Sequence, residues 1–128
     1  MKPKGIRVGA VQTRILRVLW DKGEATAREI TDELTRERPI AHSTVQTLLR
    51  KLEAKNAVAH KTSDRTFYFR ALVSAEQVTG SATRELLSRV FSGSAHDLVA
   101  HLVRHERISR KELDHIRKLI DEAEDAEG

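Results

Sequence analysis

One stretch of this chain has side chains of the kinds that bond to nucleic acid, and they share one side of a predicted helix: Ser43, Gln46, Thr47 and Arg50. Each helical residue advances about 100° around the axis, which brings these four positions together. Hydroxyls and amides can bond base edges in a groove, and a guanidinium can bond phosphates. The opposite side has apolar residues at i, i+3, i+4 and i+7: Val45, Leu48, Leu49 and Leu52. The pattern predicts a helix that buries one edge and presents a polar face to nucleic acid.

A second group with chemical potential is the histidine pair His101 and His105, spaced i, i+4. This spacing can chelate a metal ion. The metalloprotease pattern HExxH is absent, because Glu106 does not follow the first histidine. Two solvated or interface histidines are the simpler interpretation. We therefore predict no metal site, with His101 and His105 as the candidates if one exists.

Catalytic chemistry has little support in this sequence. The chain contains no cysteine, which excludes disulfides, thiolate catalysis and cysteine-ligated metals. No nucleophile–base pair, glycine-rich phosphate loop or paired-carboxylate motif appears. We predict neither an enzyme nor a bound cofactor.

Charge is distributed unevenly along the chain. Residues 1–72 hold 15 Lys/Arg against 8 Asp/Glu, a net +7, whereas residues 73–128 hold 8 against 11, a net −3. A basic first part suits a polyanionic partner, and the acidic second part argues against another such surface. No apolar run approaches the roughly 20 residues of a membrane span, and no signal-peptide pattern opens the chain. We expect no membrane partner and a cytoplasmic location.

Two helices should precede the polar-faced helix and support it. The first is predicted over residues 8–22, with Gly23 as its stop. The second opens at Thr26, where Thr26-Ala-Arg-Glu29 fits a capping box, and Pro39 should end it. The third runs from residues 42–44 to about residue 56. The last two form a helix-turn-helix.

A change of period follows over residues 58–71, which predicts a β-hairpin with a three- or four-residue loop at Ser63-Asp64-Arg65. Phe67 and Phe69 share one face and should pack in the core beneath the hairpin, while Tyr68 faces outward. Arg65, at the tip, should contact phosphate. Three helices and a basic hairpin make a winged helix-turn-helix.

The remaining chain predicts helices near residues 75–91, 95–106 and 110–125, introduced by Ser74, Ser94 and Ser109. Their apolar stripes exceed what a small domain with its own core can bury, so a second copy of the chain is the economical partner. The predicted dimerisation residues are Leu98, Val99, Leu102, Val103, Leu113, Ile116, Leu119 and Ile120. The predicted fold class is mainly α with a small β-hairpin wing. We expect residues 1–73 to form a winged-helix DNA-binding domain and residues 74–128 to form a helical dimerisation region.

Four blocks of sequence resemble the penicillinase-repressor family of bacterial winged-helix regulators, which includes β-lactamase, methicillin-resistance and copper-responsive repressors. They are ILRVLWDKGEATAREI, HSTVQTLLRKLEAKNAV, HKTSDRTFYFRALVS and LLSRVFSGSAHDLVAHL, and the likeness extends over residues 8–120. The resemblance implies a repressor that binds an inverted-repeat operator on double-stranded DNA as a homodimer, with TACA/TGTA-type half-sites in better-known members. It implies a third helix in the major groove.

The resemblance also assigns roles to individual positions. It places Ser43, Thr44, Thr47 and Arg50 against DNA, with Arg65 on the wing. With the residues that the helical face and charge add, the predicted DNA-binding set is Ser43, Thr44, Gln46, Thr47, Arg50, Lys51 and Arg65. Arg50 and Lys51 should contact phosphate, which fixes register without reading sequence.

Three departures from the family pattern bear on regulation. Some members are cleaved by a sensor protease at an Asn-Phe pair, where this chain has His101-Leu102, so the sequence argues against a protease partner. Copper-responsive members carry C-terminal cysteines, which are missing here. Gln12-Thr13 replaces the family's Glu-Trp pair.

Two alternative functions stay open. A winged helix can serve as a protein-interaction module, which would keep its partner after loss of Ser43, Thr47 and Arg50. A repressor that senses a metal or small molecule directly through its C-terminal helices is the other, and it differs only in its signal.

Overall fold

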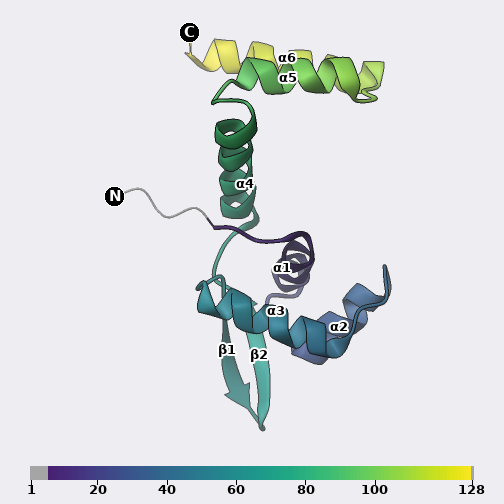
Figure 1. Cartoon of the computed structure of the whole chain (residues 1–128), viewed down its shortest axis with the longest axis vertical. Helices are drawn as coiled ribbons and strands as arrows, with labels where there is room; N and C mark the ends of the chain where they lie inside the picture. Colours follow the sequence, from purple (N-terminus) through teal and green to yellow (C-terminus); the bar gives the residue numbers. More distant parts are fainter. Residues whose placement is uncertain (1–5, 128) are drawn as a thin grey trace. The chain divides into compact units, whose positions relative to one another are not determined.

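The computed structural model describes residues 6–127 as a mainly helical chain with one β-hairpin (Figure 1). The first helices are α1 (Ala10–Lys22), α2 (Ala27–Thr35) and α3 (His42–Ala54). Strands β1 (Val58–Ser63) and β2 (Thr66–Ala71) follow, and then helices α4 (Ala75–Val90), α5 (Ala95–His105) and α6 (Arg110–Glu127). This confirms the predicted fold class and the order of its elements.

The chain forms two compact units, Met1–Glu85 and Leu86–Gly128. The first includes the start of α4, where Val78 is 7% exposed and the Ser81 hydroxyl accepts a hydrogen bond from the backbone of Ile6 at 2.7 Å. Compactness does not test which segment binds DNA and which dimerises, so the functional boundary after residue 73 stays a prediction. Within residues 6–127, no helix is long and apolar enough to cross a membrane.

One hydrophobic core holds the first unit together. The predicted stripe of α3 is confirmed, since Val45, Leu49 and Leu52 are buried and Leu48 is partly buried. They pack with buried residues of α1, α2 and the hairpin, the largest of which are Ile15, Leu16, Leu19, Ile30, Val58 and Phe69. Burying such side chains stabilises each by about 1.5–3 kcal/mol relative to exposure. The orientation of α3 is therefore set by its apolar edge.

Helix boundaries agree with the predicted caps in most places. The Thr26 hydroxyl accepts a hydrogen bond from the Glu29 amide at 3.1 Å, and the Glu29 carboxylate accepts one from the Thr26 amide at 3.0 Å. The prediction that α2 continues to Pro39 was wrong. It ends at Thr35, because the amides of Glu37 and Arg38 both turn back to the Leu34 carbonyl.

The end of α3 comes slightly before the predicted position, near residue 56. Asn56 has a φ of 61° and takes the left-handed position after the helix. The Ala57 amide bonds the Leu52 carbonyl at 2.9 Å and the Asn56 amide bonds the Glu53 carbonyl at 3.0 Å. These two bonds make a Schellman motif with asparagine as its left-handed residue. The motif turns the chain directly into β1.

The hairpin is tighter than its sequence predicted. Ser63 pairs with Thr66, which leaves a two-residue loop, Asp64-Arg65, instead of three or four residues. Both loop residues have positive φ, 49° and 64°, as a type I′ turn requires. Such a turn matches the right-handed twist of the two strands.

The predicted burial of Phe67 beneath the hairpin was also wrong. Phe69 is 7% exposed and joins the core, but Phe67 is 48% exposed. Phe67 is the second residue after the loop, where the hairpin has extended past the core. Phe69 is held close to the core by two backbone hydrogen bonds with Ala25, at 2.8 and 3.0 Å. Tyr68 is partly buried.

Helices α5 and α6 bury none of their described residues. Several of their large apolar side chains are at least 40% exposed: Val99, Leu102, Val103, Leu119 and Ile120. The predicted caps are present, since the Ser94 hydroxyl accepts from the Asp97 amide at 3.0 Å and the Ser109 hydroxyl from the Glu112 amide at 3.1 Å. These helices are locally well specified, and their apolar stripes face solvent in the single chain.

Candidate nucleic-acid interface

Every predicted DNA-binding residue has an exposed side chain. Six lie on α3 and one at the hairpin tip: Ser43, Thr44, Gln46, Thr47, Arg50, Lys51 and Arg65. Burial of Val45, Leu49 and Leu52 turns the other side of α3 outward. The only carboxylate that α3 carries, Glu53, lies in its last turn. The exposed face can therefore approach phosphates without acidic groups in its first three turns.

Contacts at the start of α3 hold it against α2. The His42 Nδ1 lies 2.8 Å from the Thr31 hydroxyl oxygen, and Thr31 itself is buried. The Thr31 hydroxyl donates its one hydrogen to the Ala27 carbonyl at 2.8 Å, so His42 must be the donor to Thr31. This chain of bonds fixes the spacing within the helix-turn-helix.

Thr47 occupies the middle of the exposed face. Its hydroxyl donates to the Ser43 carbonyl, one turn earlier, at 3.0 Å. In that rotamer the oxygen still has lone pairs that accept hydrogen bonds from outside the helix. Thr47 as a whole is exposed, and a threonine methyl group is suited to contact with a thymine methyl. Thr47 is thus able both to accept a hydrogen bond and to make an apolar contact.

The hairpin is tied to α3 by an ion-pair geometry. The His60 Nδ1 on β1 lies 2.6 Å from the Glu53 carboxylate, and both side chains are about one-third exposed or less. The His60 ring stacks on Phe67 with centroids 4.0 Å apart and planes at 17°. These contacts join the strands to the last turn of α3. They also give the Glu53 carboxylate a polar partner within the protein.

The structure brings further residues to this surface that the sequence pattern did not identify. The start of α2, the outer side of α3 and the hairpin enclose a groove of about 460 Å³. Its lining includes the cap residue Thr26 and Ala27 and Arg28 of α2. It also includes Gln46, Arg50 and Arg65 from the predicted set. The sequence could have indicated Arg28, because it lies in the first turn of the first helix of a helix-turn-helix. Such turns point at the backbone of bound DNA.

The capping box at the start of α2 also changes the acidity of Glu29. Hydrogen bonding to the Thr26 backbone amide lowers the pKa of the Glu29 carboxyl below its ordinary 4.5, with smaller help from the Thr26 hydroxyl and Lys22. Glu29 therefore stays ionised at neutral pH. Its charge is held at the N-terminus of α2, where it is stabilising.

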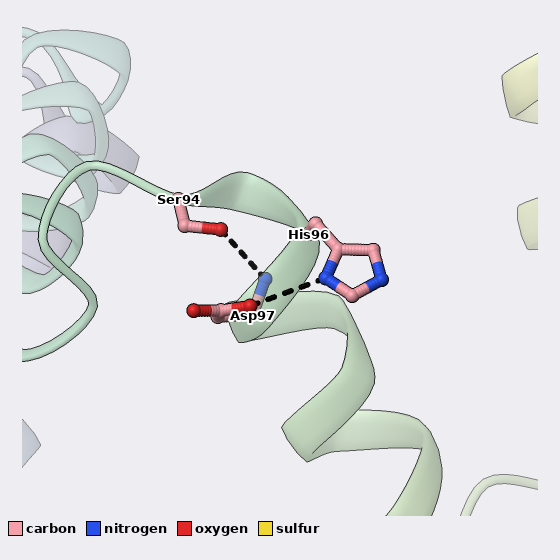
Figure 2. A network of polar contacts seen from close by, with 3 residues as sticks. All are labelled: Ser94, His96 and Asp97. Atoms are coloured by element: carbon pink, nitrogen blue, oxygen red, sulfur yellow. Dashed lines mark hydrogen bonds and ion pairs between the residues drawn. The ribbon is translucent and has the colours of Figure 1, made fainter.

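The histidine pair lies on α5, where the rings of His101 and His105 have centroids 4.7 Å apart. Near the start of the same helix, the His96 Nδ1 lies 3.1 Å from the Asp97 carboxylate. Figure 2 shows this contact beside the cap that Ser94 makes to the Asp97 amide. Among the described residues, no group of three or more His, Cys, Asp or Glu side chains could hold a metal ion. The pair supplies two ligands, whereas a structural zinc site uses four.

The fold and this surface define a winged-helix DNA-binding regulator: a helix-turn-helix, a basic hairpin wing and an exposed polar face on the second helix of the motif. A comparison with family models matches residues 8–122 to the penicillinase repressor family. The chain belongs to this family, which confirms the resemblance seen in its sequence.

Named relatives agree with that assignment over most of both chains. The transcriptional regulator BlaI of Mycobacterium tuberculosis is 29% identical over 124 residues, which cover 95% of this chain and 88% of BlaI. The methicillin resistance regulatory protein MecI of Mammaliicoccus sciuri is 22% identical over 120 residues, covering 94% and 98%. Both names describe regulators of transcription or resistance.

Solved structures support the fold. The solution structure of the DNA-binding domain of the repressor BlaI has a TM-score of 0.52 and 21% identity, covering 59% of this chain and 93% of that domain. The hsRosR-S4 complex has a TM-score of 0.54 and 15% identity, covering 94% and 93%. At these identities the likeness shows a shared fold alone.

Proposed function

We propose that this chain represses transcription by binding an inverted-repeat operator as a homodimer. Each protomer inserts α3 into a major groove, and the C-terminal helices hold the two copies at fixed half-site spacing. A bound dimer occludes the promoter. The observation that carries the proposal is the exposed polar face of α3, held in place by the His42–Thr31 and His60–Glu53 contacts.

The residues of the interface have two proposed roles. Ser43, Thr44, Gln46 and Thr47 read base edges, since hydroxyls and amides bond purine and pyrimidine edges and methyl groups contact thymine. Arg50, Lys51 and Arg65 bond phosphates and fix the register. The family resemblance supports half-sites of the TACA/TGTA type.

The dimer is proposed from the exposed stripes of α5 and α6. The predicted dimerisation residues comprise Leu98, Val99, Leu102, Val103, Leu113, Ile116, Leu119 and Ile120, and five of these have side chains at least 40% exposed in the single chain. A symmetric pair covers such stripes by presenting the same surface twice. A palindromic operator then matches the twofold symmetry of the protein.

Selection from a pool of random duplexes tests the proposal directly. The full chain should enrich a palindrome whose half-site centres lie about one helical turn, 10–10.5 base pairs, apart or a multiple of it. Enrichment of no motif would overturn sequence-specific repression. Enrichment of a single half-site would overturn the dimer while leaving DNA reading intact.

A further inference from the structure

The groove between α2, α3 and the wing has the size of a small-molecule site as well as a place in the DNA interface. Its volume is about 460 Å³, within the usual 300–1,000 Å³ of ligand pockets. The lining that matters for a ligand consists of Arg28, Leu49, Arg50, Arg65, Phe67 and Phe69. All belong to the first compact unit.

The lining is apolar in its deeper part. Leu49 is 1% exposed and Phe69 is 7% exposed, so both already belong to the core. Phe67 is 48% exposed and lies with its ring centroid 6.3 Å from that of Phe69, edge to face. Phosphate contact alone does not need an exposed aromatic ring. His60 stacks on Phe67 with centroids 4.0 Å apart, and the part of the ring that stays exposed gives a planar apolar ligand a surface to pack against.

The rim of the same groove is cationic. Arg28, Arg50 and Arg65 make no hydrogen bond or ion pair with any side chain in the described part of the chain. The one acid in the lining, Glu53, lies 2.6 Å from His60. Three available guanidinium groups thus surround an apolar floor. Guanidinium groups favour planar, bidentate partners such as carboxylates.

We propose that this groove binds a planar aromatic carboxylate of one or two rings, and that its occupancy weakens DNA binding. The ring packs against Phe67 and Phe69, and the carboxylate bonds guanidinium groups of the rim. Arg50 and Arg65 cannot serve the ligand and DNA phosphates at once. The effect on DNA rests on the proposed function, whereas ligand binding itself does not.

Naphthoate is a suitable probe, titrated by calorimetry into the full chain without DNA. We expect saturable binding of one molecule per chain. Neutral naphthalenemethanol and inorganic phosphate should each bind at least about tenfold more weakly than naphthoate. The alcohol lacks the carboxylate, and phosphate lacks the aromatic ring. Phe67→Ser should weaken naphthoate binding about fivefold or more through lost apolar contact. Arg28→Gln should do the same through lost charge.

Leu72→Ser is the matched control, since Leu72 is 47% exposed and lies outside the groove lining. It should bind naphthoate like the parent chain, and thermal unfolding should show each variant to be folded. Equal binding of naphthoate and phosphate, equal binding of the neutral alcohol, or an unchanged Phe67→Ser variant would each overturn the site. So would the lack of saturation.

A second titration addresses regulation and separates the two proposals. The affinity of the full chain for duplex DNA is measured with and without saturating naphthoate. A lower affinity for DNA in the presence of naphthoate supports the inference, provided that naphthoate has a smaller effect on the Phe67→Ser variant. Unchanged DNA affinity with naphthoate bound overturns the regulatory part. Failure to bind duplex DNA without naphthoate overturns the proposed function, while the calorimetric result still decides the site.

Discussion

At the scale of single residues, the interface combines polar groups that read and cationic groups that hold. Thr47 bonds its own helix at 3.0 Å and remains able to accept a hydrogen bond. Arg50 is exposed one turn from Gln46. Because the two kinds of group act on different parts of DNA, their removal should have different effects on specificity.

Thr47→Ala should reduce the preference for operator over random duplex about fivefold, the effect of losing a contact worth about 1 kcal/mol. Arg50→Ala should weaken operator and random duplex alike, and lower the slope of log affinity against log salt by about 0.9. Fluorescence anisotropy at several salt concentrations measures both effects. Arg107→Ala, which removes an exposed charge from the loop after α5, is the control. Unchanged binding in both test variants would show that α3 does not enter the groove.

At the scale of elements, the wing depends on an unfavourable turn. Asp64 and Arg65 both occupy the left-handed region, which costs an L-residue roughly 1–2 kcal/mol. Aspartate is common at the first position of a type I′ turn and glycine is preferred at the second. Arginine at the second position makes the turn less stable than glycine would, and it places a cation at the tip of the wing.

Arg65→Gly should therefore raise the free energy of unfolding by about 0.5–1 kcal/mol while it weakens binding to every duplex. Urea denaturation and anisotropy measure the two quantities. Asp64→Gly relieves strain in the same turn without loss of the cation, so it should leave DNA binding at least as strong. Equal DNA affinities of Arg65→Gly and Asp64→Gly would show that Arg65 faces solvent and does not contact DNA.

The cap of α2 adds a dependence on pH. The pKa of Glu29 is lowered in the folded chain by its bond to the Thr26 amide. Because the pKa of Glu29 is lower in the folded chain than its ordinary 4.5, its ionised form stabilises the folded state at pH values above 4.5. This stabilisation is lost as the pH falls through the folded pKa. The folded chain therefore loses stability in acid.

Glu29→Ala should cost about 0.5–1 kcal/mol of unfolding free energy at neutral pH, an estimate kept small because the side chain is exposed. The cost should shrink as the pH falls from 4.5 through the lowered pKa of Glu29, because the parent chain then loses the same charge. Urea denaturation at several pH values checks both. Asp125→Ala, an exposed carboxylate on α6, serves as the control. A cost that stays constant or grows in acid would contradict the cap assignment.

At the scale of the whole molecule, the C-terminal helices bury no residue in a single chain, although their caps and apolar stripes are well formed. Leu102 and Leu119 are 40% and 65% exposed. Apolar surface of this kind is typical of an interface. Two linked DNA-reading units gain affinity because the second half-site is bound at high effective concentration.

Leu102→Asp and Leu119→Asp should each convert the chain to monomers in sedimentation experiments, because a buried unpaired charge opposes association. Operator affinity should fall about 100-fold or more, while one half-site is still bound weakly. Leu72→Asp places a charge at a similarly exposed apolar position outside these helices and should leave the dimer intact. A dimer that survives both substitutions would exclude α5 and α6 as its interface.

The sequence by itself determined the order of the elements, the buried edge of α3 and the caps at Thr26, Ser94 and Ser109. These features depend on residues within one or two turns, so periodicity and capping patterns carry them. The family membership was visible for a related reason, since four such blocks recur in a set order.

Only the tertiary structure decided how the wing meets α3. The two-residue turn and the exposure of Phe67 follow from the twist of the hairpin and the distance it extends past the core, neither of which alternation encodes. The His60–Glu53 contact joins two elements, and the groove joins three. Arg28 and Phe67 therefore enter the site through packing between elements, because long-range proximity is set by the shared core and not by local spacing.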